Sequence, residues 1–251
     1  MKNFTLFISV VFIFFFSCEK LKKEKKTELP GKTVCVFFDL SLSTAKKEIR
    51  ESYCNNLKLI MKSINHGDVI VGGLITQKSI SELAFCFQYE FPKFVPSTNN
   101  PLFKKSELKQ FQNRIVVVKD SLLAVADSVI MSLNARIMKT EIMSAMQVAE
   151  RVFSRDKSRK VLVIMSDMIE DSPLHRFQTD NLTTQRIQTK IENERKNNML
   201  PNLKDVNVYV LGATAKSTKK YLQIRNFWKG YFDACEATLI DYGSSLIRFS
   251  E

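Results

Sequence analysis

Two hydroxyls and a carboxylate stand at alternate positions in residues 39–43, Asp-Leu-Ser-Leu-Ser. This segment directly follows the apolar run Thr33–Phe38, which is typical of a buried strand. On a tight turn, Asp39, Ser41 and Ser43 can converge on one point. Hard oxygen ligands of this kind suit Mg²⁺, which takes about six oxygens at about 2.1 Å and retains several waters. The pattern is short, so its weight depends on where other polar residues lie.

Two further oxygen-bearing residues are expected near the same point. Thr140 opens the helical stretch Thr-Glu-Ile-Met-Ser-Ala-Met, and Asp167 follows the buried strand Lys160–Met165. Ligands of parallel sheets bind at the carboxyl ends of the strands, so these segments can meet in one cleft. Each residue taken singly could instead cap a helix. Taken jointly, the five oxygens favour a metal site.

The elements that must position these residues alternate along the chain. Strands are expected at Thr33–Phe38, Asp68–Thr76, Leu83–Phe94, Lys160–Met165, Val206–Leu211 and Ala237–Tyr242. Helices are expected at Ala45–Ile64, Ser106–Leu133, Glu141–Phe153 and Thr218–Cys235, with a polar, mostly helical connector at Arg176–Asn198. Pro92 places the third strand at an edge, and the β-branched run Ile115–Val118 could break the long helix. This order predicts an α/β fold, a doubly wound (Rossmann-like), mostly parallel six-stranded sheet with helices on both faces.

Together these residues and elements resemble the von Willebrand factor A (VWA) domain family and its metal-ion-dependent adhesion site (MIDAS). The family pattern has Asp-x-Ser-x-Ser after the first strand, a Thr before a central helix and an Asp after the fourth strand. The matching residues here are Asp39, Ser41, Ser43, Thr140 and Asp167. The resemblance covers roughly residues 32–245, and one departure is Met168, where many members have Gly.

The resemblance implies a binding mechanism. Ser41, Ser43 and Thr140 would bind Mg²⁺ or Mn²⁺ directly through their hydroxyls, and Asp39 and Asp167 would act chiefly through water. An open position on the metal would accept an Asp or Glu side chain from a partner protein, with no bond broken.

Other polar residues near these positions have weaker claims. Arg136 and Lys139 flank Thr140 and could draw an acidic ligand toward the metal, although a generic basic loop explains them equally well. Glu170 and Asp171 could tune the site, but a solvated loop is preferred. His66 and His175 have no partner at metal-ligand spacing, so both are expected at the surface or in turns.

The N-terminal residues predict export and a lipid anchor. Lys2 precedes the apolar stretch Phe4–Phe16 and then Ser17 and Cys18, a sequence similar to a bacterial lipoprotein signal in which the cysteine is acylated. The alternatives are an ordinary signal peptide or an uncleaved anchor. We therefore expect a signal peptide at 1–17, a charged tether at 18–30 and a VWA-like domain at 31–251, held in the bacterial cell envelope.

Cysteine use is compatible with export. The other cysteines, at 35, 54, 86 and 235, form no CxxC or zinc pattern. Cys35 and Cys86 lie in apolar strand-like runs, where a cysteine behaves as a small buried hydrophobe. Free thiols are therefore favoured over disulfides.

Composition narrows the class of partner. The 251 residues carry a net charge of +12, and +9 remains for residues 31–251 once Lys2 and the +2 of the tether are set aside. Few Gly and Pro residues and an apolar content of 45% exclude collagen-like and wholly disordered chains. Export argues against nucleic acid as the partner. Anionic lipid, envelope polysaccharide or an acidic protein remain, and a carboxylate-seeking metal site favours the protein.

Two alternatives to metal-dependent binding stay open. A Mg²⁺-dependent hydrolase or phosphotransferase could use Asp39 as a nucleophile, but such enzymes usually present a second carboxylate two positions later, where this chain has Ser41. No Gly-rich phosphate loop and no Gly-x-Ser-x-Gly elbow is present in the sequence. We therefore do not expect an enzyme. A scaffold protein that keeps the fold and never fills the site is the other alternative.

Overall fold

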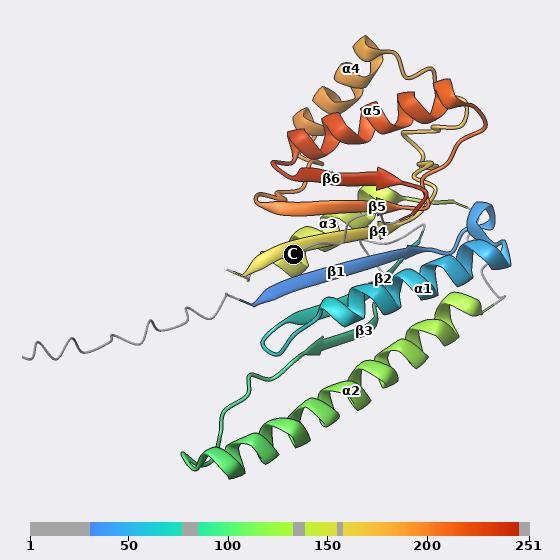
Figure 1. Cartoon of the computed structure of the whole chain (residues 1–251). Helices are drawn as coiled ribbons and strands as arrows, with labels where there is room; N and C mark the ends of the chain where they lie inside the picture. Colours follow the sequence, from blue (N-terminus) through green and yellow to red (C-terminus); the bar gives the residue numbers. More distant parts are fainter. Residues whose placement is uncertain (1–30, 77–84, 133–138, 155–157, 246–251) are drawn as a thin grey trace, which may run out of the picture.

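The computed structural model describes residues 31–76, 85–132, 139–154 and 158–245, and its six strands form one sheet (Figure 1). Their order is β3-β2-β1-β4-β5-β6, with β3 antiparallel to β2 at one edge and all other neighbours parallel. The bounds are β1 Lys32–Asp39, β2 Val69–Ile75, β3 Phe85–Glu90, β4 Arg159–Met165, β5 Val206–Leu211 and β6 Thr238–Gly243. The predicted fold class is confirmed, including the edge position of the third strand.

Helices cover both faces of this sheet. Their bounds are α1 Lys47–Ser63, α2 Pro101–Met131, α3 Ile142–Phe153, α4 Thr184–Lys196 and α5 Thr218–Ala234, with a short 3₁₀ turn, η1, at Leu42–Thr44. The predicted break near Ile115–Val118 is wrong, because α2 continues through it. A β-branched residue costs a helix only a few tenths of a kcal/mol. Ile115 and Val118 more than offset this cost by packing against the core.

The central strand β1 contributes side chains to both hydrophobic cores. Val34, Val36 and Phe38 face the core that includes α1 and the C-terminal half of α2, whereas Cys35 and Phe37 face the core that includes α3, α4 and α5. Successive side chains of a strand point to opposite faces, so a strand buried on both faces must be apolar throughout. This is why the apolar runs in the sequence located the parallel strands.

The aromatic side chains of α5 form the centre of the second core. Phe227, Trp228, Tyr231 and Phe232 are fully buried. Trp228 lies 5.4 Å from Tyr231 in an edge-to-face arrangement, measured between ring centroids. These aromatic side chains therefore serve core packing.

The cysteines and the helices relate to two expectations from the sequence, the free thiols and the place in the cell envelope. Cys35, Cys54, Cys86 and Cys235 are free thiols, and Cys86 is the least buried of the four. Among the described residues, no helix is both long enough and apolar enough to cross a membrane.

The substitution Leu162→Ala tests how much the stability of the fold depends on the core to which β1 and β4 contribute. Its side chain is fully buried in the central strand β4, so Leu162→Ala should lower the free energy of unfolding by about 2–5 kcal/mol through lost burial and a residual cavity. Urea unfolding followed by circular dichroism measures the change. Leu59→Ala is the matched control, because Leu59 on α1 is 51% exposed and should shift stability by less than about 1 kcal/mol. Equal effects of the two substitutions would contradict this assignment of the core.

Candidate metal-binding site at the carboxyl edge of the sheet

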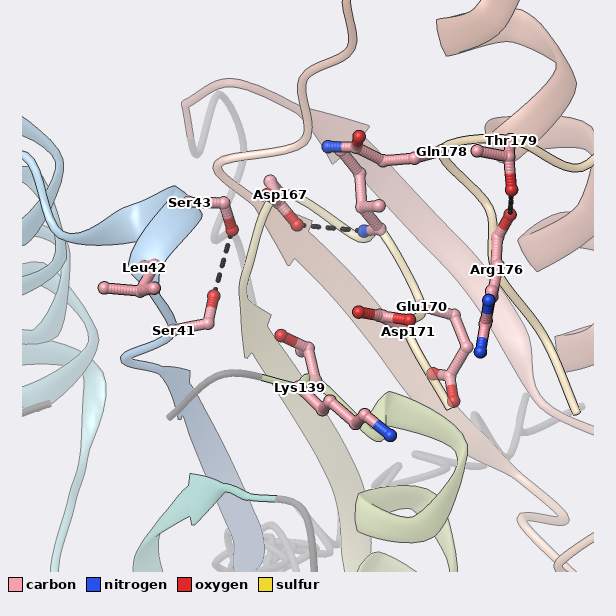
Figure 2. A pocket seen from close by; sticks show the side chains of 12 residues that line it. Ser41, Leu42, Ser43, Lys139, Asp167, Glu170, Asp171, Arg176, Gln178 and Thr179 are labelled. Atoms are coloured by element: carbon pink, nitrogen blue, oxygen red, sulfur yellow. Dashed lines mark hydrogen bonds between the residues drawn. The ribbon is translucent and has the colours of Figure 1, made fainter. Parts of the chain in front are cut away.

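A cavity of about 400 Å³ opens at the carboxyl edge of the sheet (Figure 2). Four of the five predicted ligand residues line it, and they come from three segments far apart in the sequence. The lining comprises Ser41, Leu42, Ser43, Lys139, Thr140, Asp167, Ile169, Glu170, Asp171, Arg176, Gln178 and Thr179. Asp39, the fifth predicted residue, is fully buried. The structure thus brings the predicted residues together, as their positions at strand ends required.

The turn after β1 is held by its own polar side chains. Asp39 Oδ1 accepts a hydrogen bond from the backbone N–H of Ser41 at 2.9 Å, which closes an Asx-type turn. The Thr44 hydroxyl donates to the Asp39 carbonyl at 2.6 Å. Together these bonds turn the chain sharply into η1. The hydroxyls of Ser41 and Ser43 consequently lie on one side, 2.9 Å apart (Figure 2).

The carboxylate of Asp39 also joins the ends of two strands. Its Oδ2 accepts a hydrogen bond from the Ser166 hydroxyl, after β4, at 2.7 Å. Ser166 in turn accepts from the backbone N–H of Met168 at 3.0 Å. Both carboxylate oxygens of Asp39 therefore have protein partners, so its role is to hold Ser41 and the β4 loop in place. Sequence reasoning missed Ser166, although its place directly before Asp167 was a signal.

Asp167 presents its side chain to the cavity from the loop after β4. Its Oδ1 accepts a hydrogen bond from the Ile169 N–H at 2.9 Å, and its carbonyl accepts from the Thr214 N–H at 3.3 Å. The next residue, Met168, has a left-handed backbone with φ of 63°. The Met168 side chain is fully buried, and its carbonyl accepts a hydrogen bond from Trp228 Nε1 at 2.9 Å. Met168 is thus a non-glycine residue in the conformation that glycine adopts most easily.

Glu170 is a structural residue of the site, and the expectation of a solvated loop is wrong. Its side chain is 1% exposed, and Oε2 accepts hydrogen bonds from the backbone N–H groups of Ile142 at 2.7 Å and Met143 at 3.2 Å. These are free N–H groups at the start of α3, so Glu170 caps that helix from another loop. The Asp171 N–H also donates to the Thr140 carbonyl at 2.9 Å. Thr140, just before α3, is therefore fixed against the β4 loop.

The outer wall of the cavity carries cationic and amide side chains. Lys139 lies at its lower side in Figure 2, and Arg176, Gln178 and Thr179 form the opposite wall. The segment that provides this wall was expected to be only a connector. Arg136, predicted alongside Lys139, lies outside the described residues, as does Cys18.

His175 anchors that wall, and its predicted place at the surface is wrong. It is 5% exposed, its Nε2 lies 2.8 Å from Glu194 Oε1, and Lys190 Nζ lies 3.2 Å from its Nδ1. Lys190 also forms an ion pair with Asp180 at 3.0 Å. These contacts join α4 to residues 175–180. His66, in contrast, lies exposed in a turn, as predicted.

The electrostatics of the site favour a cation. Burial raises the pKa of Asp39, although the Ser41 N–H and the Ser166 hydroxyl act in the opposite direction. Burial and the nearby charge of Asp39 raise the pKa of Asp167 to about 6, against hydrogen bonds from Ser43 and Ile169. Two buried carboxylates thus disfavour each other's charge, and a bound cation would relieve this.

The donor set decides which cation fits. Within the described ranges, no three His, Cys, Asp or Glu side chains gather as a metal-ligand cluster. The oxygens on offer come from Ser41, Ser43, Thr140 and Asp167. A hydroxyl-rich set with few carboxylates fits a hard ion that keeps part of its hydration, such as Mg²⁺ or Mn²⁺, and does not fit a site for zinc.

Comparisons with known proteins give remote similarities in structure. No protein-family model and no curated protein sequence matches the chain. Among solved structures, it is similar to a von Willebrand factor type A protein from Catenulispora acidiphila, with 11% identity and a TM-score of 0.41, covering 86% of this chain and 39% of that one. It is also similar to the human COPII-coat protein Sec24c, with 10% identity and a TM-score of 0.38, covering 82% and 32%. The chain spans well under half the length of either protein. The fold is therefore assigned from its strand order.

Glu170 gives the site a characteristic pH dependence of stability. Burial raises its pKa from 4.5 to about 8 in the folded chain, so between these values the folded state binds more protons than the unfolded state. The stability that this group contributes is present below about pH 4.5 and is lost as the pH rises through about 8. The slope from one group is at most about 1.4 kcal/mol per pH unit.

Urea unfolding with a chelator present, at pH 5 to 8.5, measures this dependence. Glu170→Gln keeps an acceptor for the N–H groups of α3 but cannot ionise, so its stability should vary less with pH than that of the parent chain. Glu51→Gln, at an exposed position on α1, is the matched control and should follow the parent. If Glu170→Gln left the pH profile unchanged, the buried carboxyl would not be the titrating group.

Proposed function

We propose that this chain is a lipid-anchored bacterial envelope protein whose VWA-like domain binds a partner protein through a MIDAS-type Mg²⁺ or Mn²⁺ site. Ser41, Ser43 and Thr140 would hold the ion directly and Asp167 would act chiefly through water, whereas Asp39 holds Ser41 and the β4 loop in place. The ligand is an Asp or Glu side chain of the partner. Cys18 carries the lipid, and the domain binds without breaking a bond.

One observation carries the proposal. Hydroxyls and a carboxylate from three segments, at residues 41–43, 140 and 167, line a single cavity at the carboxyl edge of the sheet. Capping alone does not explain this arrangement. The first N–H groups of α3 are taken by Glu170, and neither Glu141, the N-cap of α3, nor Ser41, the N-cap of η1, makes a side-chain cap.

The chemistry follows from the charge balance of the donors. A divalent ion, when bound, supplies an electrophilic centre for a partner's carboxylate. Because Ser41, Ser43 and Thr140 are neutral donors, they leave most of the ion's positive charge uncompensated. Asp39, with both oxygens bonded to the protein, keeps the two serine hydroxyls oriented. Lys139 and Arg176 at the cavity wall add long-range attraction for an acidic partner.

Metal binding is the first test. The chain should bind Mn²⁺ and Mg²⁺ with one site, and Ser41→Ala, Ser43→Ala and Thr140→Ala should each weaken binding about tenfold or more, because each removes a direct ligand. Isothermal titration calorimetry and Mn²⁺ paramagnetic resonance measure this.

Ser106→Ala is the matched control, because Ser106 is an exposed serine on α2 and far from the cavity lining. Asp39→Ala should also abolish binding, and its melting temperature separates loss of the ligand from loss of the fold. Absence of binding in the parent chain, or equal binding in all variants, would show that the site is not metallic.

Partner capture is the second test and separates the alternatives. Pull-down from envelope extract should recover a protein in the presence of Mg²⁺, and chelation or Thr140→Ala should release it, because the partner's carboxylate has then lost its counter-ion. A capture that survives chelation would favour a metal-independent scaffold. Mg²⁺-dependent turnover in a phosphatase or esterase screen, abolished by Asp39→Asn, would favour the hydrolase.

A further inference from the structure

The N-terminal end of α2 forms a projecting tip with an unusual surface. Leu102 and Phe103 are 80% and 64% exposed, and Lys104 and Lys105 follow them in the first helical turn, also exposed. Two large apolar side chains next to two cations are costly to leave in water without a use. We propose that this tip, residues 101–105, docks on an anionic lipid bilayer. The inference goes beyond the proposed metal-dependent function and does not require a bound ion.

The tip lies at the edge of the sheet opposite the metal site. β3 runs antiparallel to β2 and ends at Glu90, which pairs with Val69 at the start of β2. The chain therefore reaches the amino edge of the parallel strands before α2 begins. At the other end of α2, the carbonyl of Ile130 accepts a hydrogen bond from Arg50 Nη1, near the start of α1, at 3.0 Å. Figure 1 shows α2 below the sheet, running from the side where β1 begins to the side where β1 ends.

The first turns of α2 extend past the rest of the domain. Phe111 is the first buried residue of the helix, and its ring lies 6.5 Å from the ring of His66, in the turn before β2. Ten helical residues precede Phe111, which at 1.5 Å per residue is about 15 Å of helix. The tip can therefore reach a flat surface before most of the amino edge does.

The tip is held in one conformation by the loop before it. Asn100 caps the helix, accepting a hydrogen bond from the Leu102 N–H at 3.1 Å, and Pro101 occupies the first helical position. The loop is tied to the helix by Phe94, whose ring lies 5.4 Å from that of Phe111, and by the Ser97 N–H, which donates to Glu107 at 3.1 Å. Because the start of the helix is held in this way, Leu102 and Phe103 remain exposed.

The positive charge around the tip favours an anionic bilayer as the surface to which it binds. Residues 91–114 contain five basic side chains (Lys93, Lys104, Lys105, Lys109 and Arg114) and one acidic side chain, Glu107. Apolar side chains beside lysines at a protruding helix end match the interface of an anionic membrane, where rings insert and ammonium groups meet headgroups. The positive end of the helix dipole adds positive potential at the same place.

The predicted anchor would bring the tip into range of such a surface. β1 begins at Lys32, also at the amino edge, fourteen residues after Cys18. Extended chain spans at most about 3.5 Å per residue, so a lipid on Cys18 would hold the amino edge within about 50 Å of the bilayer. Docking by the tip would then orient the metal site away from the membrane.

Vesicle binding by residues 19–251 tests the proposal without the lipid. This chain keeps every residue of both hydrophobic cores, which begin at Val34. It should co-sediment with vesicles of phosphatidylglycerol and phosphatidylcholine at 3:7, in chelator, and bind pure phosphatidylcholine at least tenfold more weakly. Leu102→Ser/Phe103→Ser and Lys104→Gln/Lys105→Gln should each reduce binding to anionic vesicles about tenfold or more.

Val116→Ser/Val117→Ser is the matched control, because these residues are also exposed on α2, 54% and 64%, but lie farther along the helix. It should bind like the parent chain. A second readout uses the single native tryptophan, Trp228, which is fully buried. In Phe103→Trp, the introduced tryptophan should shift to the blue and be quenched by brominated lipid, whereas in Val117→Trp it should not.

Several results would overturn the proposal. These are absence of vesicle binding, equal binding to neutral vesicles, or retained binding by both tip variants. Loss of vesicle binding in the Val116→Ser/Val117→Ser control alone would also overturn it. Dimerisation through the tip without vesicle binding would assign the surface to a second copy of the chain. None of these outcomes depends on Mg²⁺ or the partner, so failure here is distinguishable from failure of the metal site.

Discussion

The buried carboxylate of Asp39 is the constraint on which the site depends. A charge with no exposed surface at the end of a central strand is very costly unless its oxygens are hydrogen-bonded. The Ser41 N–H and the Ser166 hydroxyl meet that need, and in doing so they fix the turn after β1 and the loop after β4. One side chain thus fixes the two segments that carry Ser43 and Asp167 into the cavity wall.

The same edge gathers acidic side chains that have different roles in the fold. Asp39 uses both of its carboxylate oxygens to hold the turn and the β4 loop, and Glu170 caps α3. Asp167 is the acidic side chain that combines burial with a place on the cavity next to the serine hydroxyls. Because Asp39 is occupied elsewhere, the oxygens beside Asp167 at the cavity come from the neutral hydroxyl residues Ser41, Ser43 and Thr140.

The sequence predicted the fold well because the inner parallel strands are largely apolar on both faces, a pattern that needs no knowledge of distant contacts. It also predicted that the oxygen-bearing residues would lie close together, because four of them stand at strand ends and Thr140 directly precedes a helix, which are local signals. Glu170 and His175 were misjudged for the opposite reason. Glu170 is buried by N–H groups 27 and 28 residues away, and His175 by Glu194, 19 residues away. Only the packed arrangement shows that these partners exist.

The left-handed backbone of Met168 has a consequence for how the loop after β4 responds to a ligand. A glycine there would leave the peptide free to adopt several conformations, whereas Met168 is fixed by its buried side chain and by the bond from Trp228 to its carbonyl. The loop that carries Asp167 is therefore ordered before anything binds. A ligand bound at this wall would lose little free energy to rearranging it, so selectivity in the proposed binding would come from shape and charge already in place.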